Sequence, residues 1–435
     1  MTWNIYAPIS QQLRMAHGSD SWSDSFITWA ENTSNVTFLI ALPAACYSFD
    51  RVGPRRLTLV SAALLVASTA LRVLPLEGAP LASTVLLSMG LNGVSGPFFV
   101  FGAPIISQLW FCASERTMAT AISVAAPSFG SALGFLAGPY IVGQPQDRSS
   151  ALAGLQRLYA IQLFGSVLAL VLVVLRFPDK PERQPSQTAS NAASSGTPGN
   201  AAKEWLLLLG NADAGQTETV VRTWWLIVCS AIPIGLYGGF AVVLDLNLGK
   251  PPLSLSTMQA GFLGATMTIV GCVGSVLVGF VMDRFERGLK SMILVMMLTA
   301  AISSAAFAVD VHEAVHIGPA VAVPLAYATA IVTGFASSTA YALFFELIME
   351  TTFGFMTPNA VCSFVVFVGT IVQIAFLSVP TSIDGSAEWM NWTVGIAACV
   401  FGALMLLFRP KYLRLDLDSQ AGSEIEASAR YSGCI

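Results

Sequence analysis

The sequence contains few charged residues for its length. Only 11% of its 435 residues are Asp, Glu, Lys or Arg, whereas 54% are hydrophobic. A water-soluble chain of this size needs far more polar surface, so the composition predicts an integral membrane protein with the lipid bilayer as its surrounding. The net charge is −4, which leaves no basic surface for a nucleic acid, and no nucleic-acid partner is expected.

Motifs of enzymes, metal sites and cofactor sites are missing as well. The seven cysteines show no CxxC or Cys/His spacing and lie mostly in apolar runs, where a small buried hydrophobic residue is the expected role. Neither a nucleophile motif nor a phosphate-binding loop occurs. We therefore expect no enzyme, no metal site and no cofactor. No basic region with a small-residue cleavage site precedes the first apolar run, so a cleavable signal is not expected either.

Long apolar segments are abundant instead. Taking about 20 apolar residues as one helical span, we predict eleven spans, near residues 24–49, 57–76, 82–111, 117–143, 153–176, 222–247, 258–282, 290–309, 318–348, 357–380 and 390–409. The residues from Met1 to about His17 are helix-like but too short to cross. We interpret them as the second half of a first helix, with a late start of the sequence favoured over a short helix.

One loop pattern occurs twice and organises the chain. Residues 50–56 and 283–290 each end an apolar segment with Asp-Arg, turn through a Gly and add further basic residues. Two copies about half a chain apart predict a tandem repeat of one six-helix membrane unit. The predicted parts are an N-terminal bundle (1–176), a disordered linker (177–221) with Trp205–Leu209 on the membrane surface, a C-terminal bundle (222–409) and a disordered tail (410–435).

The basic residues predict the orientation of these parts. If both Asp-Arg loops are cytosolic, all but five of the 21 Lys and Arg residues lie on the cytosolic side. Cytosolic connections carry an excess of Lys and Arg, so this arrangement is favoured, with the linker and the C-terminus in the cytosol. The exceptions, assigned to the other side, are Arg14, Arg72, Arg148, Arg157 and Lys250.

The paired loops also suggest a mechanism. An Asp at a helix end can bind basic residues of neighbouring helices in one global state and release them in another, which makes a two-state latch. The alternative is that the basic residues only anchor the topology. The predicted latch residues are Asp50, Arg51, Arg55, Glu115, Arg116, Asp283 and Arg284.

Several acidic residues inside the spans are candidates for proton coupling. Thr28, Glu31, Asn32 and Asn35 recur at helical spacing and share one face, which we expect to line a water-accessible cavity or else to form a structural polar cluster. Asp245 is a second candidate, or a partner of Lys250. Glu346 and Glu350 lie one helical turn apart, so each would raise the proton affinity of the other unless basic loops pair with them.

The paired loops and the stripe of small residues over 130–143 with Pro139 resemble the major facilitator superfamily. That resemblance implies an all-α membrane protein with the major facilitator fold, two six-helix bundles with the first helix apparently truncated. Longer stretches resemble solute carrier family 49, with its feline leukaemia virus subgroup C receptor-related and disrupted in renal carcinoma branches. These stretches are residues 3–9, 21–22, 110–121, 244–246, 259–262 and 345–353.

The resemblance implies transport of a small organic solute. Choline and haem are associated with one branch and proton-driven pyridoxine uptake with the other. The aromatic cage of the choline carriers falls on Trp3 and Tyr237 here, whereas Gly96 stands where those carriers have a Gln. The predicted substrate-binding residues are Trp3, Asn4, Tyr6, Asn32, Asn35 and Tyr237.

From the sequence we therefore expect an alternating-access transporter in the plasma membrane or an endolysosomal membrane. Its partners would be a small-molecule substrate and protons, with Glu31 or Asp245 as the coupling group. The alternative is a membrane receptor or sensor that binds a solute without moving it.

Overall fold

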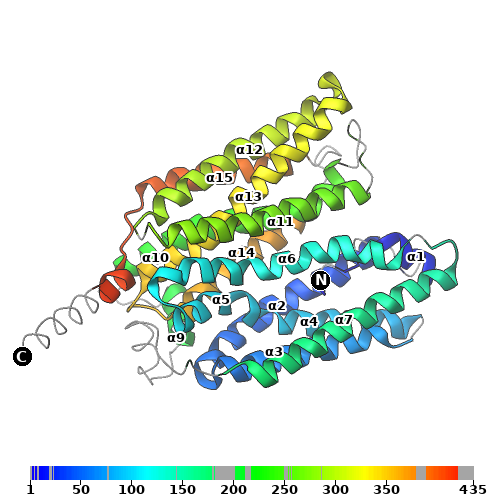
Figure 1. Cartoon of the computed structure of the whole chain (residues 1–435), viewed down its shortest axis with the longest axis horizontal. Helices are drawn as coiled ribbons and strands as arrows, with labels where there is room; N and C mark the ends of the chain where they lie inside the picture. The colour runs from blue at the N-terminus through cyan, green and yellow to red at the C-terminus, as the bar shows by residue number, and fades with distance from the viewer. Residues whose placement is uncertain are drawn as a thin grey trace, which may run out of the picture.

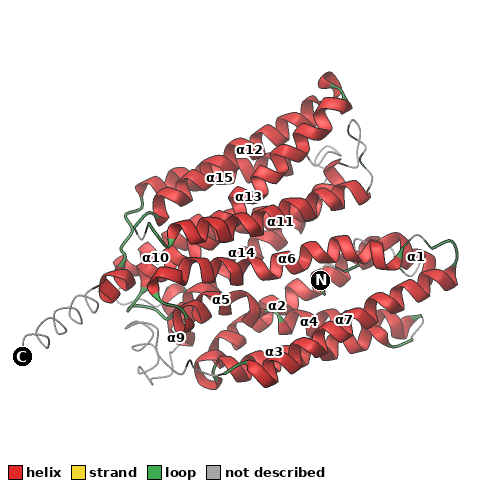
Figure 2. Ribbon diagram, in the orientation of Figure 1, coloured by secondary structure: helices red, strands yellow, loops and turns green. Residues whose placement is uncertain are grey.

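The computed structural model describes residues 2–3, 5–6, 9–18, 22, 24–75, 78–143, 145–178, 181, 201–210, 217–248, 253, 255, 257–285, 287–378 and 388–419. All regular elements in these ranges are helices, and most of them run along the long axis of the molecule (Figures 1 and 2). The all-α class expected from the apolar runs is confirmed.

The helices of the N-terminal half are α1 (Ser10–His17), α2 (Asp24–Val52), α3 (Pro54–Val73), α4 (Ala79–Ser95), α5 (Pro97–Trp110), η2 (Ala113–Glu115), α6 (Arg116–Val142) and α7 (Arg148–Arg176). Helix α9 (Ala201–Leu208) follows in the linker. The C-terminal half contains α10 (Thr217–Leu248), α11 (Thr257–Met282), α12 (Leu289–Ile317), α13 (Pro319–Thr352), α14 (Pro358–Ser378) and α15 (Glu388–Leu407). Among the described residues, nine helices are long and apolar enough to cross a membrane.

The stretch expected as one span over 82–111 is two helices. Helix α4 ends at Ser95 and α5 begins at Pro97, with Gly96 between them. Proline has no amide hydrogen to donate, and its ring collides with the preceding helical turn, so it starts a helix more readily than it continues one. The expectation of one continuous helix is wrong here, and the break places Gly96 against Trp3.

The two repeated loops lie at the same end of the molecule. The α2–α3 connection and the α11–α12 connection are both at the left in Figure 1, close to the end of the described chain. We call this end, defined by residues 51–56, 283–285 and 287–288, the latch end, and the opposite one the far end. The distribution of basic residues predicts that the latch end is cytosolic.

The two halves meet where α6 packs along α11 and where α14 packs on α2 and α5. Gly279 of α11 permits the closest approach at the latch end. A Cβ atom at this position would lie 3.1 Å from the carbonyl oxygen of Thr117 and from the Cα of Met118 in α6. Small residues let helix backbones approach in a bilayer, where association depends on packing rather than on exclusion of water.

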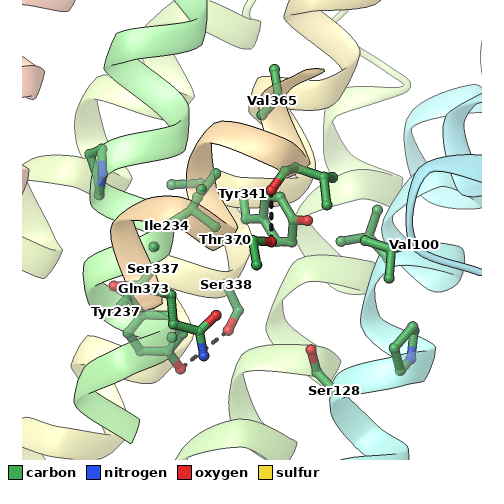
Figure 3. Close-up of a pocket in the computed structure, with 18 of the residues that line it drawn as sticks. Val100, Ser128, Ile234, Tyr237, Ser337, Ser338, Tyr341, Val365, Thr370 and Gln373 are labelled. Carbon is green, nitrogen blue, oxygen red and sulfur yellow. Dashed lines mark hydrogen bonds between the residues drawn. The ribbon is translucent and has the colours of Figure 1, made fainter. Parts of the chain in front are cut away.

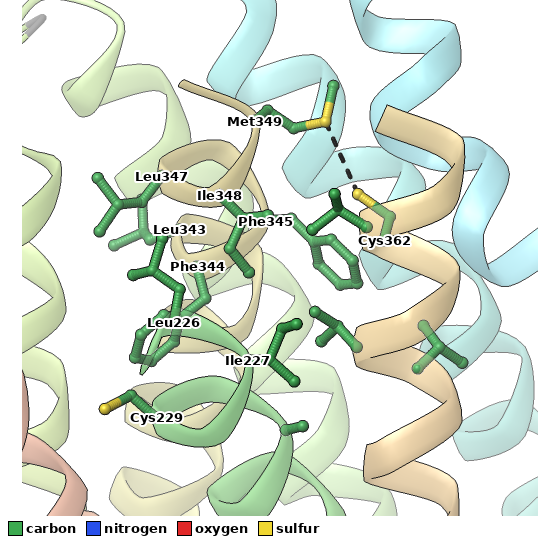
Figure 4. Packing of buried hydrophobic residues seen from close by; sticks show 14 of the residues in the cluster. Leu226, Ile227, Cys229, Leu343, Phe344, Phe345, Leu347, Ile348, Met349 and Cys362 are labelled. Atoms are coloured by element: carbon green, nitrogen blue, oxygen red, sulfur yellow. Dashed lines mark hydrogen bonds between the residues drawn. The ribbon is translucent and has the colours of Figure 1, made fainter. Parts of the chain in front are cut away.

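Helix α13 lies at the centre of the C-terminal half. Residues 342–352 are all buried, and Leu343 and Phe344 belong to the same apolar core as Leu226 and Ile227 of α10 (Figure 4). Apolar residues occur on every side of this helix, so they define no single core-facing stripe. Its sequence alone therefore does not tell which of its side chains face the space between the halves.

Part of the linker is ordered, contrary to expectation. Helix α9 packs on α2, α10 and α14, and the Trp205 indole Nε1 donates to the Ser363 hydroxyl at 3.2 Å. The ring also meets Phe364 and Phe367 edge-on, with centroids 5.1 and 5.2 Å apart. The expectations of a disordered segment at 201–210 and of a membrane-surface position for Trp205 are therefore wrong, because the aromatic pocket between the halves accepts the ring. Residues 182–200 and 211–216 lie outside the described residues.

Part of the tail is ordered too. Residues 413–419 form a helix that lies at the latch end (Figure 1), whereas residues 420–435 lie outside the described residues. The expectation of disorder fails for 410–419, because charged side chains of this segment find buried partners on the helices of both halves.

We predict that Trp205→Ala lowers the free energy of unfolding by about 2 kcal/mol, because the substitution removes an aromatic ring from the seam between the halves. Thermal melting followed by fluorescence-detected size exclusion measures the loss. Leu206→Ala on the same helix is the matched control, since Leu206 is 50% exposed. Equal melting temperatures for the two variants would contradict the assignment.

Candidate functional site

A cavity of about 610 Å³ lies between the two halves. Its walls come from α2, α5 and α6 on one side and from α10 to α15 on the other. Figure 3 shows part of this lining, from α5, α6, α10, α13 and α14. The lining residues fall near the middle of long helices, for example 233–238 in α10, so the cavity lies near the middle of the membrane. Its size is that of a small-molecule site.

Three polar residues of α2 line the cavity from the N-terminal half. They are Glu31, Asn32 and Asn35, which the helical spacing puts on one face. The Asn35 carboxamide oxygen accepts a hydrogen bond from the Trp3 indole Nε1 at 3.2 Å. The polar face of α2 thus orients an aromatic ring as well as presenting its own polar atoms to the cavity.

Trp3 is held on its other sides by packing. Its ring meets Phe38 edge-on at 5.6 Å between centroids. A Cβ atom at Gly96 would lie 2.7 Å from the indole Cζ3, which is closer than a real contact. Gly96 therefore leaves the space that the ring occupies, and this gives a physical reason for a glycine at this position.

The C-terminal half contributes a second group of polar and aromatic residues. The Tyr237 hydroxyl of α10 lies 3.5 Å from the Ser338 hydroxyl of α13, and either can donate. The Gln373 carboxamide of α14 extends toward the same pair (Figure 3), and Tyr341 of α13 lines the cavity nearby. Rings, hydroxyls and an amide therefore converge here from three helices.

Glu31 is the only charged side chain among the described residues that line the cavity. A carboxylate at this depth is costly unless it faces water or a partner, and such residues usually mark a pathway for a solute or a proton. Aromatic faces attract cations because of the negative potential over the ring. The cavity is therefore suited to a cation or to a flat polar ring.

Three of the predicted site residues are not seen to line the cavity: one is buried elsewhere, and two lie wholly or partly outside the described residues. Tyr6 is fully buried inside the N-terminal half, where its ring packs on Trp22 at 5.5 Å. Asn4 lies outside the described residues, and so does the side chain of Asp245, whose backbone belongs to α10.

Asp283 joins the two halves at the latch end. Its carboxylate accepts hydrogen bonds from the backbone amides of Thr117 at 2.8 Å and Met118 at 3.0 Å, in the first turn of α6. A carboxylate at a helix N-terminus satisfies free amides and complements the helix dipole, and such a contact contributes about 1 kcal/mol. The latch of the C-terminal copy therefore binds the backbone of the other half rather than an arginine.

Burial raises the pKa of the Asp283 carboxyl above its usual 3.8, although the amide donors counteract it. A raised pKa means that the closed latch binds a proton more tightly than a state in which Asp283 faces water. This contribution to closure is present at pH values below the usual pKa, and it is lost as the pH rises through the raised value.

Glu346 and Glu350 share one partner from the tail. The Arg414 guanidinium donates from Nε to Glu350 at 2.7 Å and from Nη2 to Glu346, and all three residues are buried. Burial alone would lower the pKa of Arg414, but the two carboxylates outweigh it and raise the pKa above its usual value. Glu346 also accepts a hydrogen bond from Thr120 of α6, so the pair is connected to both halves.

The tail segment contacts the N-terminal half directly. The Arg116 guanidinium, at the start of α6, lies 3.0 Å from the Asp418 carboxylate; the Arg116 side chain is 3% exposed and that of Asp418 is 9% exposed. A further ion pair joins Asp416 to Arg287 at 2.7 Å, where both groups are exposed. Residues 412–419 therefore bridge α6 and α13 across the latch end, and we call them the tail strap.

The remaining latch candidates lie apart from this network. The Arg51 guanidinium stacks on Tyr47 at 4.4 Å, and Arg55 donates to the carbonyl of Val174 in α7 at 3.3 Å. Arg284 stacks on Phe280 at 5.1 Å, and Glu115 is exposed. The side chain of Asp50 lies outside the described residues.

The sequence of this chain matches a known family over most of its length. Residues 1–357 match the Major Facilitator Superfamily. The chain belongs to this superfamily. It is 29% identical to the solute carrier family 49 member 4 homolog of Xenopus tropicalis, over 96% of this chain and 89% of that protein. The choline/ethanolamine transporter FLVCR2 of Homo sapiens is 23% identical, over 68% of this chain and 54% of its own.

The fold is similar to that of solved structures. The proton:xylose symporter XylE bound to 6-bromo-6-deoxy-D-glucose matches with a TM-score of 0.68 at 15% identity, over 95% of this chain and 94% of that one. The expected major facilitator fold and the resemblance to solute carrier family 49 are confirmed. The protein is an integral membrane transporter, and in this superfamily substrates bind between two halves that rock about a central site.

The sequence analysis did not find several lining residues of this major facilitator protein. Tyr341, Ser338 and Gln373 come from helices in which almost every position is apolar, so no periodicity indicates the cavity face. Gln373 is an isolated amide in such a run, and that signal could have found it. Arg414 was missed for another reason, because its partners lie in α13, far away along the chain.

Replacing Gly96 by Ala should displace the Trp3 ring and weaken substrate binding. The backbone of Gly96 is α-helical, with φ −72°, so alanine fits the backbone and the effect comes from its methyl group. We expect the apparent KM of solute uptake to rise about tenfold. Gly165→Ala is the control, because nothing lies within 4 Å of a Cβ atom there. The same KM for both variants would refute the packing argument.

Removing Arg414 should open the latch end. Cys46, 1% exposed, lies in the seam between α2 and α14, where Ser363 donates to its sulfur at 3.1 Å. In a background that keeps only this cysteine, we expect Arg414→Gln to raise the rate of labelling by N-ethylmaleimide about tenfold, because Glu346 and Glu350 lose their buried counter-charge. Arg409→Gln, an exposed site in the same segment, should leave the rate unchanged.

Proposed function

We propose that the protein carries a small organic cation of the choline type across the membrane by alternating access, with a pyridoxine-like vitamin as the second candidate substrate. The observation that carries this proposal is the cavity between the halves. It combines aromatic rings from both halves with a single carboxylate, that of Glu31, among its described lining residues.

The chemistry of the wall fits such a substrate. An ammonium group gains energy over the faces of Trp3 and Tyr237, and a nearby carboxylate adds electrostatic attraction that the low dielectric of the membrane strengthens. The Asn35, Ser338 and Gln373 side chains supply donors and acceptors for a substrate hydroxyl.

The same lining residues also allow the other candidate substrates to be compared. A pyridoxine-like ring can stack on the aromatic side chains, and its hydroxyls can bind the same polar groups. Haem carries two carboxylates, and the described lining residues include no Lys, Arg or His to receive them. Haem is therefore the least favoured of the three substrates considered.

The relatives support this class of substrate and a proton as the coupling ion. FLVCR2 is named a choline/ethanolamine transporter and XylE a proton:xylose symporter. Glu31 lines the cavity and is our first choice for the proton-coupling group, with Asp245 as the second. Glu346 and Glu350 belong to the gate at the latch end, where they act with Arg414 to keep that side closed.

The transport cycle follows from these two sites. In the state described, the latch end is closed by Asp283 on α6 and by the tail strap. Binding of substrate and proton in the cavity has to favour the rearrangement that breaks these contacts, because a ligand shifts a conformational equilibrium only by its difference in affinity for the two states.

Uptake of radiolabelled choline and pyridoxine into proteoliposomes across a pH step tests the proposal. We expect uptake of one of them to depend on the pH gradient, and Glu31→Gln to abolish that dependence or to lower uptake at least tenfold. Asp245→Asn tests the second carboxyl in the same way. Glu218→Gln is the control, because that side chain is 79% exposed.

The outcomes separate the alternatives. If uptake does not depend on pH and is unchanged in Glu31→Gln and Asp245→Asn, these two carboxyls are not the coupling groups, although transport itself would stand. Saturable binding without net flux would identify a solute-binding receptor or sensor instead. If neither compound is bound or taken up, the substrate class is wrong.

A further inference from the structure

Arg72 is a buried arginine that lines no part of the cavity. It lies in the last turn of α3 and is 6% exposed. The sequence analysis assigned Arg72 to the non-cytosolic side of the membrane, but it did not predict that the side chain is buried. Among the residues that the structure describes, no carboxylate lies within 4.0 Å of its guanidinium, although a buried charge in a membrane usually has one.

Neutral acceptors surround the guanidinium instead. Its Nε donates to the Ser88 hydroxyl of α4 at 2.8 Å, and Nη1 donates to the Gln162 carboxamide of α7 at 3.2 Å. The same Nη1 donates to the backbone carbonyl of Thr2 at 3.1 Å. Arg72 therefore joins three helices of the N-terminal half to a backbone atom that precedes Trp3.

The Thr2 carbonyl needs such a donor because residues 2–3 are not helical. In a bilayer, a backbone carbonyl outside a helix has to find a partner within the protein. Asn92 of α4 is the second partner, donating to the same carbonyl at 3.4 Å and accepting from the Thr2 hydroxyl at 3.1 Å. Bonds from a charged donor are stronger than neutral ones, so Arg72 is the main anchor.

We propose that Arg72 is a positioning residue for the substrate cavity: by holding the Thr2 carbonyl, it keeps the Trp3 indole between Asn35, Phe38 and Gly96. The anchor and the ring are on consecutive residues, so movement of the Thr2 carbonyl moves the ring. The three contacts of the indole are short-range and cannot adjust to a shift of the backbone. Substrate affinity then depends on a residue that never touches the substrate.

The inference rests on the proposed function only where transport is measured, so its first test needs no substrate. Hydrogen–deuterium exchange of the purified protein should show faster exchange in the peptide over residues 2–9 of Arg72→Met than in the wild type, by about tenfold. Peptides of α4 and α7 should exchange as in the wild type. An unchanged 2–9 peptide, or faster exchange throughout the bundle, overturns the proposal.

The second test asks whether Arg72 acts through Trp3. In proteoliposomes loaded by uptake of radiolabelled choline, and in parallel pyridoxine, Arg72→Met should raise KM about tenfold with kcat within twofold of the wild type. In a Trp3→Ala background the same substitution should raise KM no further. If the increases in KM caused by Arg72→Met and Trp3→Ala multiply in the double variant, Arg72 stabilises the bundle in general, and the proposal is overturned.

Two further variants complete the design. Arg72→Lys keeps one charged donor for the carbonyl but loses the planar fork, so its KM should fall between those of wild type and Arg72→Met. Arg157→Met is the matched control, an exposed arginine in the same half that should change neither exchange nor KM. If the wild type takes up neither compound, the proposed function fails, while the exchange experiment still decides the role of Arg72.

Discussion

A membrane interior offers polar groups no water, so each buried polar atom has to find its partner in the protein. This constraint accounts for the most unusual features of the structure. The free amides at the start of α6 bind Asp283, the Thr2 carbonyl binds Arg72, and Glu346 and Glu350 bind Arg414. In each case the partner comes from a distant part of the chain, so satisfying a local need also ties separate elements together.

The three pairings act at different levels of the transport cycle. The Arg72 pairing lies inside one half and moves with it, so it can hold the shape of the cavity wall in every state. The Asp283 contact joins the halves, and the tail strap also spans both, so both have to break when the latch end opens. In the cycle that we propose, contacts within a half set what is bound, and contacts between the halves set when it is released.

The sequence predicted the parts of the structure that depend on local patterns. The length of apolar runs located the helices, the repeated Asp-Arg loops indicated the duplication, and the spacing of Glu31, Asn32 and Asn35 identified a polar face that lines the cavity. Features that depend on distant partners were missed. Nothing near Arg414 indicates that it is buried, and nothing near Trp205 indicates an aromatic pocket formed by another helix. The cavity face of the C-terminal helices was not predicted, because apolar residues occur on their exposed sides as well as on their buried sides.

The tail strap also affects the order in which charges are paired during biosynthesis of the protein. Arg414 and Asp418 are synthesised after Glu346 and Arg116, the residues whose charges they neutralise. Until residue 418 has been synthesised, Glu346 and Arg116 lack these partners. A chain cut short by a premature stop codon before Arg414 would keep those charges exposed. Synthesis of residues 414–418 is therefore the step at which the buried charges at the latch end first become balanced.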